Sequence, residues 1–168
     1  MGAREELIEA NGAFAAGFDK GDLEISPAKP VVVLTCIDAR IDPAKALGLE
    51  IGDAHVIRNA GGRATDDAIR SLLISSWLLG TREYLVIHHT DCGMTKFTDD
   101  VLIGMIKENT GEDVSGREFL SFSDVDVSVQ EDVETLRGVV KALPEGVSVS
   151  GHVYDVQTGS IREVVPAS

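Results

Sequence analysis

The sequence predicts an α/β fold, a doubly wound and mostly parallel sheet flanked by helices. Apolar runs rich in β-branched residues alternate along the chain with longer stretches at helical spacing, which is the order that parallel sheets require. The first run, residues 31–35 (Val-Val-Val-Leu-Thr), has no charged position, as expected of a strand that is covered on both faces. Right-handed crossovers leave open which strands are central. We expect the order 2-1-3-4, with a last antiparallel strand at one edge.

We expect a single domain over residues 1–168, in which residues 1–29 form an amino-terminal helix and a connector, and residues 30–168 form the α/β core. A chain of 168 residues with 43% apolar composition is long enough to bury a core. Leu7, Ile8 and Phe14 give the amino-terminal segment an apolar side at rough helical spacing. Because this helix precedes the first strand, it packs either on a neighbouring subunit or on its own sheet.

The remaining elements follow from periodicity and from residues that begin or end helices. Asp42 is the expected N-cap of a short helix with Pro43 in its first turn, and Gly80 ends a longer helix whose inner face includes Trp77. The predicted helices are 42–47, 67–79, 94–109 and 129–143; the further strands are 54–58, 84–87, 147–154 and 160–165; residues 111–128 are an irregular acidic connection.

Charge and composition exclude several classes of partner and location. The formal net charge of −13 argues against a nucleic acid or an anionic membrane as partner. The amino terminus is charged and no run of eighteen apolar residues occurs, so we expect a cytoplasmic protein. Two cysteines, Cys36 and Cys92, are too few for a disulfide framework. A bridge between them is disfavoured in a reducing cytosol, and metal binding or catalysis is the better interpretation.

Polar side chains follow two of the predicted strands. Cys36 comes directly after the first strand, and His89 and Cys92 follow the strand at 84–87. If these strands are neighbours, the three side chains meet where the winding of the sheet reverses, which is where open sheets bind ligands. Two thiolates and one imidazole are typical of a catalytic zinc site. Alternatively, Cys36 is a small buried apolar residue and His89 a loop histidine. His88 competes as a ligand, but on a strand it would point to the face opposite His89.

Asp38 and Arg40 lie two residues apart and can form a bidentate ion pair. Such a pair is often only structural. Beside a metal, however, a carboxylate held by arginine stays ionised and can accept the proton of a zinc-bound water, whose pKa zinc lowers to about 7. His55 would suit a proton shuttle because histidine titrates near neutral pH, but no pattern places it near the strand ends, and we expect it to be exposed or structural.

These motifs resemble those of the β-class carbonic anhydrases. Cys36-x-Asp38-x-Arg40 and His89-x-x-Cys92-Gly93 are similar to the zinc and dyad motifs of that class. Residues 58–61 (Arg-Asn-Ala-Gly) are similar to its turn after the second strand, and the resemblance extends from about residue 30 to the end of the chain. The short length of the chain and the sequence of residues 89–94 (His-Thr-Asp-Cys-Gly-Met) resemble the compact prokaryotic and archaeal branch, which is related to carbonyl sulfide hydrolases.

The resemblance implies one Zn²⁺ per chain, with Cys36, His89 and Cys92 as ligands and Asp38–Arg40 as the catalytic dyad. It implies a carbonate dehydratase, in which a zinc-bound hydroxide hydrates carbon dioxide reversibly to bicarbonate. It also implies a homodimer with the site near the interface, or a tetramer, with the amino-terminal helix at a contact.

Four alternatives stay open or are disfavoured at this point. Relatives in the same branch hydrolyse carbonyl sulfide or carbon disulfide with the same ligands, so the substrate is open. A structural zinc site in a dimeric binding module would have a closed fourth coordination position. A phosphatase-like Cys36 nucleophile would need an arginine six residues later, where Asp42 stands. In some relatives the aspartate of the dyad binds zinc directly in an inactive form, and the sequence leaves this open for Asp38.

Overall fold

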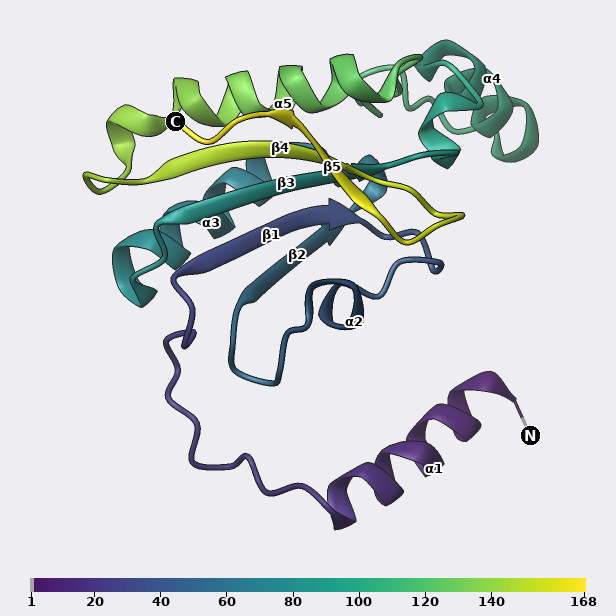
Figure 1. Cartoon of the computed structure of the whole chain (residues 1–168). Coiled ribbons are helices and arrows are strands. Elements are labelled where there is room, and N and C mark those ends of the chain that lie inside the picture. The colour runs from purple at the N-terminus through teal and green to yellow at the C-terminus, as the bar shows by residue number, and fades with distance from the viewer. Residues whose placement is uncertain (1) are drawn as a thin grey trace.

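The computed structural model describes residues 2–168 and is built on a five-stranded sheet in the order β2-β1-β3-β4-β5 (Figure 1). The parallel strands are β1 (Val31–Cys36), β2 (His55–Asn59), β3 (Glu83–His89) and β4 (Ser148–Tyr154). The last strand, β5 (Ile161–Val165), runs antiparallel to β4 at one edge. The predicted fold class, the 2-1-3-4 order and the antiparallel edge strand are confirmed.

The two helices that build the core are α3 (Asp66–Leu79) and α5 (Val125–Gly138). Buried residues of both helices belong to one apolar cluster with alternate residues of the three inner strands. Because side chains alternate along a strand, α3 and α5 share one face of the sheet. The short helix α2 (Pro43–Leu47) contributes to a small cavity with Val33 and Ile87, and so lies against the other face.

Helix α5 lies unusually close to strand β4. A Cβ at Gly151 would overlap Val129 and would lie 2.9 Å from Cγ2 of Val133. Only glycine therefore allows the helix to pack at this distance from the sheet. The position of α5 matters for the functional site, because this helix also carries a buried carboxylate.

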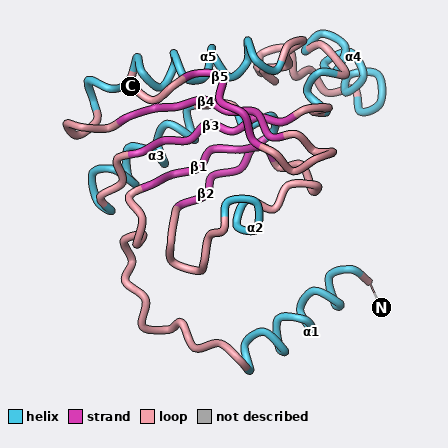
Figure 2. The backbone as a smooth tube through the Cα atoms, viewed as in Figure 1, coloured by secondary structure: helices cyan, strands magenta, loops and turns pink. Residues whose placement is uncertain are grey.

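Helix α1 (Ala3–Ala16) lies apart from the sheet at the end of an extended connector, as Figure 2 shows. All of its residues are described, and none of them is buried. The prediction of an amino-terminal helix is confirmed, and within this chain it packs neither on the sheet nor on the other helices. Among residues 2–168, no helix has the length and apolar character needed to cross a membrane.

Helix α4 (Asp99–Thr110) begins later than the predicted start at residue 94. The hydroxyl of Thr98 accepts a hydrogen bond from the backbone N–H of Val101 and so acts as the N-cap. Met94 and Phe97, which the periodicity assigned to the helix, pack instead against Cys36 and Cys92. The prediction of the helix start was wrong because these apolar residues serve a tertiary contact.

Helix α5 begins and ends earlier in the chain than the predicted range 129–143. It begins at Val125, because the carboxylate of Asp124 accepts hydrogen bonds from the backbone N–H groups of Asp126 and Val127. It ends at Gly138, and a short 3₁₀ turn follows at Val140–Ala142. The first turn of the helix therefore lies inside the acidic segment that was predicted to be irregular.

The predicted inner face of α3 is correct except at its end. Ala68 and Leu72 are buried as expected, whereas Trp77 is 61% exposed and its Nε1 donates a hydrogen bond to the carbonyl of Ala142. Ser75 is buried instead, and its Oγ lies 2.7 Å from Nδ1 of His55. His55 stands at the start of β2, so it is a structural histidine at the far end of the strands from Cys36.

Candidate metal centre

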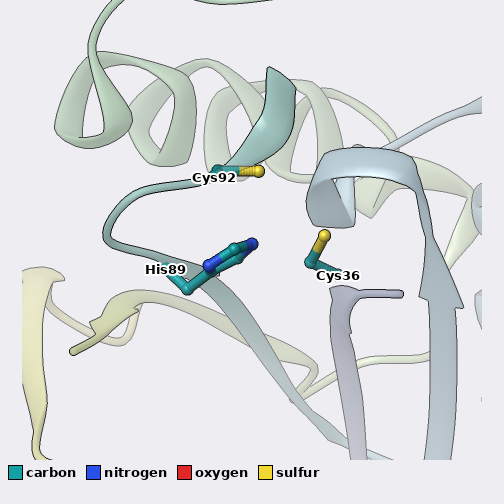
Figure 3. A group of neighbouring side chains, drawn as sticks. All are labelled: Cys36, His89 and Cys92. Carbon is teal, nitrogen blue, oxygen red and sulfur yellow. The ribbon is translucent and has the colours of Figure 1, made fainter. Parts of the chain in front are cut away.

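The sheet topology brings three candidate ligands together. Cys36 is the last residue of β1, His89 is the last residue of the neighbouring strand β3, and Cys92 follows in the next turn. The sulfur and nitrogen atoms of these side chains lie within 4.8 Å of one another, and all three residues are buried. In Figure 3 the side chains converge on a common centre from three directions.

The hydrogen bonds of His89 orient its free nitrogen toward the thiols. Nδ1 lies 3.0 Å from the carbonyl oxygen of Thr90, which can only accept, so Nδ1 carries the proton and Nε2 presents a lone pair. Among the described residues this buried Nε2 has no hydrogen-bond partner. A buried polar atom without a partner is costly, and a metal ion would satisfy it.

The two cysteines share a hydrogen bond that makes them unequal. The pKa of Cys36 lies well below its usual range, first because the Cys92 thiol donates to its sulfur, with further hydrogen bonds from the backbone N–H groups of Asp38 and Gly61. The pKa of Cys92 is raised because it donates to Cys36 and because it is buried. A ready thiolate, a second thiol and an imidazole lone pair fit the donor set of a three-ligand zinc site.

His88 points to the other face of the sheet, as the alternation of a strand requires. Its Nε2 lies 3.2 Å from the carbonyl oxygen of Gly62, and its Nδ1 lies 3.1 Å from Oγ of Ser128 in α5. Both ring nitrogens are therefore engaged away from the two cysteines. His88 is excluded as the competing ligand.

Asp38 and Arg40 form the predicted ion pair beside the three donors. Oδ1 of Asp38 accepts from the backbone N–H of Arg40 at 2.9 Å and from its Nε at 3.0 Å, and Oδ2 accepts from Nη2 at 2.7 Å. These hydrogen bonds hold the pKa of the carboxyl well below its usual range. Oδ2 lies 3.8 Å from Nε2 of His89, so an ionised carboxylate stands at the edge of the donor set.

Arg40 has a second partner that the sequence reasoning missed. Its Nη1 donates to Oδ2 of Asp91 at 3.0 Å, and its Nη2 donates to the Asp91 carbonyl at 2.9 Å. Asp91 has a φ of 51°, in the left-handed region that few residues other than glycine adopt. Arg40 therefore ties the loop after β1 to the loop after β3. The available signal was an aspartate between the two ligands of the His89-x-x-Cys92 motif.

Arg58 supports the same loop from strand β2. Its Nε donates to the Cys36 carbonyl at 2.9 Å, and its Nη2 donates to the Asp38 carbonyl at 2.8 Å. In the sequence, Arg58 is part of the family-like turn at residues 58–61, and no motif predicts which residue it contacts. Its two hydrogen bonds fix the backbone on both sides of Ile37.

The donors open into a cavity of about 330 Å³ with mostly apolar walls. Asp38 is the single charged residue among those that line it: Cys36, Ile37, Asp38, Ala60, Gly61, Cys92, Gly93, Met94 and Phe97. Met94 and Phe97 could not be assigned to the site from the sequence, because their spacing also suited a helix. The cavity suits a small apolar molecule next to one carboxylate.

Comparison with known proteins agrees with this geometry. The family model for carbonic anhydrase matches residues 31–113. Beta-carbonic anhydrase 1 of Mycobacterium tuberculosis is 42% identical over 99% of this chain and 100% of its own length. The chain belongs to the β-carbonic anhydrases. A crystal structure of the carbonic anhydrase of Streptococcus mutans superposes on this family member with a TM-score of 0.92 and 44% identity, and covers 98% of each chain.

A second group of relatives carries a different name. The carbon disulfide hydrolase of Saccharolobus solfataricus is 34% identical to this β-carbonic anhydrase over 78% of the chain and 75% of its own length. The similarity therefore extends to relatives named for two different activities.

Proposed function

We propose that this β-carbonic anhydrase catalyses the reversible hydration of carbon dioxide to bicarbonate. In this proposal Cys36, His89 and Cys92 hold one zinc ion, and Asp38 and Arg40 act on the water. The observation that carries the proposal is the ionised Asp38 carboxylate beside three zinc-type donors at an apolar cavity. The full-length similarity to a protein named beta-carbonic anhydrase 1 supports carbon dioxide as the substrate.

The roles of the residues follow from their contacts. Zinc in such a site supplies Lewis acidity, which makes water a nucleophile near pH 7. Asp38 would accept a hydrogen bond from a water held at this site and would orient the lone pair of that water toward the cavity. Arg40 holds both carboxylate oxygens and keeps Asp38 ionised. Ile37, Met94 and Phe97 offer apolar walls to carbon dioxide.

We infer that Asp38 stays outside the ligand set in the active enzyme. To bind zinc directly, its carboxylate would have to give up the three hydrogen bonds from Arg40. A structural zinc site with a closed fourth position would also leave the apolar cavity and this ion pair without a use. These contacts favour an enzyme over a binding module.

The first test measures zinc content and carbon dioxide hydration on the same sample. We expect one zinc ion per chain, and we expect Cys36→Ala to lose both zinc and hydration because one of three ligands is gone. Removal of zinc with a chelator should abolish activity, and added zinc should restore it. A Cys36→Ala protein with full activity and no metal would contradict the proposal.

Hydrolysis of carbon disulfide or carbonyl sulfide is the second candidate. It is favoured by the similarity to carbon disulfide hydrolases, and the same cavity would accept these molecules. Turnover of the three compounds should be compared on one zinc-loaded preparation. We expect carbon dioxide to give the highest kcat/KM, and a higher value for either sulfur compound would make the second candidate the correct one.

We also propose that the active form is a homodimer in which helix α1 packs against a second copy. Leu7 and Ile8 are each 71% exposed and Phe14 is 56% exposed, although helices normally bury such an apolar side. A solved structure with the same fold, at 17% identity, is described as one of two tetrameric β-carbonic anhydrases from Sordaria macrospora. Assembly beyond the dimer is compatible with this arrangement.

A further inference from the structure

A carboxylate on the opposite face of the sheet contacts the backbone behind the metal centre. We propose that Asp132, in helix α5, is a positioning residue that holds the turn at residues 60–64 against Cys36 and thereby fixes the geometry of the metal site. This inference rests on the proposed zinc site. Asp132 itself touches none of the three donors.

Asp132 belongs to a buried cluster of charged groups. It is 3% exposed, and its partner Arg63 is 7% exposed. Oδ1 of Asp132 accepts hydrogen bonds from the backbone N–H of Ala64 at 3.1 Å and from Nε of Arg63 at 3.3 Å. Oδ2 lies 3.0 Å from Nε of Arg63 and 3.0 Å from Nε2 of His88. Buried charges are paired in this way because an unpaired one is strongly disfavoured.

The turn that Asp132 holds is the wall behind Cys36. Gly61 and Gly62 both have left-handed backbones, with φ of 81° and 73°. A Cβ at Gly62 would lie 3.0 Å from the carbonyl carbon of Thr35 and 3.1 Å from the backbone nitrogen of Cys36, so the turn packs directly on the end of β1. The backbone N–H of Gly61 donates to the sulfur of Cys36. Displacement of this turn would therefore change the position and the hydrogen bonding of one donor.

The same carboxylate also reaches the strand that carries the second donor. His88 precedes His89 on β3, and its Nε2 lies 3.0 Å from Oδ2 of Asp132 and 3.2 Å from the carbonyl oxygen of Gly62. Ser128, one turn before Asp132 on α5, contacts Nδ1 of His88 and Nη1 of Arg63. Asp132 thus links the turn behind Cys36 to the strand end at His89, and sets the two donors relative to each other.

The chain offers a matched control at the preceding residue. Glu131 pairs with Nη2 of Arg63 at 3.1 Å, but its side chain is 57% exposed. Among the described residues it makes no hydrogen bond to Ala64 or His88. Glu131→Gln therefore removes a carboxylate from the same arginine without releasing the turn. Val133→Ala supplies the second control, because Val133 is a buried core residue of α5 without a polar contact to the turn.

The test is a measurement of zinc affinity by chelator competition, together with unfolding by urea and the absorption spectrum of the Co²⁺-substituted protein. We expect Asp132→Asn to weaken zinc binding by about 10- to 100-fold, the usual effect of losing a group that orients a metal ligand, and to change the Co²⁺ spectrum. Glu131→Gln should stay within about twofold of wild type, as expected of an exposed ion pair. Val133→Ala should lose stability while its zinc affinity and Co²⁺ spectrum stay those of wild type.

Several outcomes would overturn the inference. If Asp132→Asn binds zinc within about twofold of wild type, or if Val133→Ala weakens zinc as much, Asp132 does not position the site. If Asp132→Asn does not fold, Ser128→Ala decides: weaker zinc binding at wild-type stability supports the inference, and unchanged binding overturns it. A wild-type protein that binds no zinc overturns the proposed function as well, whereas a zinc-binding wild type with an unaffected Asp132→Asn variant overturns this inference alone.

Discussion

At the scale of single residues, Asp38 has two kinds of neighbour that together determine its use. On one side Arg40 donates three hydrogen bonds and keeps the carboxylate ionised. On the other side Oδ2 faces His89 and the cavity. Arg40 is itself held by Asp91, so rotation of the pair would break contacts in two loops. A carboxylate fixed in this way can interact with a further hydrogen-bond donor only from the side that faces His89 and the cavity.

We expect Asp38→Asn to lower kcat/KM for carbon dioxide hydration by about 100-fold or more, because a neutral amide lacks the negative charge that orients the water and favours loss of its proton. Zinc content should stay at the wild-type level, since Asp38 is outside the proposed ligand set. Stopped-flow hydration assays and metal analysis of the same preparation measure both quantities.

Asp42→Asn provides the matched control for this substitution. Asp42 is the N-cap of α2, and asparagine caps helices about as well as aspartate, so activity and stability should hardly change. If Asp38→Asn keeps activity within about threefold of wild type while Asp42→Asn behaves as expected, then Asp38 has no part in proton transfer.

At the scale of elements, the turn at residues 60–64 shows why the site tolerates only glycine at one position. Several glycines have left-handed backbones, but their surroundings differ. A Cβ at Gly111, the C-cap of α4, meets nothing within 4 Å, whereas a Cβ at Gly62 meets the backbone of Thr35 and Cys36. Backbone atoms in the middle of a sheet cannot move aside.

Gly111→Ala should lower the free energy of unfolding by about 1–2 kcal/mol, the cost of the left-handed backbone alone. Gly62→Ala should cost about 1–3 kcal/mol more, because the added methyl group also overpacks the end of β1. Urea unfolding of the two variants measures the difference. Equal losses would show that the turn can move away from the strand, and would remove the structural reason for a glycine at that position.

The elements that the sequence predicted correctly are those determined by local chemistry. Apolar runs located the strands, and Asp42 and Gly80 located helix ends, because caps and periodicity act over a few residues. The errors occurred where tertiary contacts decided. Trp77 is exposed and donates to the carbonyl of Ala142, whereas the buried Ser75 bonds to Thr81, and Met94 belongs to the wall of the metal centre rather than to α4.

In the candidate site, too, some contacts could be predicted from the sequence and others could not. The meeting of Cys36, His89 and Cys92 could be predicted because parallel strands end at the same edge of a sheet. The contact between Asp132 and the turn at residues 60–64 could not, since the two segments are far apart in the sequence and no motif connects them. The sequence around a buried aspartate in a helix does not indicate which residue its carboxylate contacts.

At the scale of the whole molecule, helix α1 buries none of its residues against the rest of the described chain, residues 2–168. Its apolar side runs through Leu7, Ile8 and Phe14, and its connector holds it away from the sheet (Figure 1). Exposed apolar surface of this kind is typical of an interface between copies. The proposed dimer would bury it.

We expect the double substitution Leu7→Asp and Phe14→Asp to convert the dimer into a monomer of 17.9 kDa, because two carboxylates would be buried in the interface. Sedimentation velocity measures the change. Ala13→Asp is the control: Ala13 follows Leu7 by six residues, which places it on the other side of the helix, so the dimer should persist. Dimers of equal stability in both proteins would exclude α1 from the interface.

The position of Asp132 in the chain has a consequence for biosynthesis. All three donors are made before residue 93, whereas α5 and β4, which carry Asp132 and Gly151, are made after them. Until α5 docks, the backbone N–H of Ala64 lacks the hydrogen bond to Asp132, so the turn behind Cys36 is completed only after the donors are made. Gly151, which lets α5 pack close to the sheet, is needed for this last step.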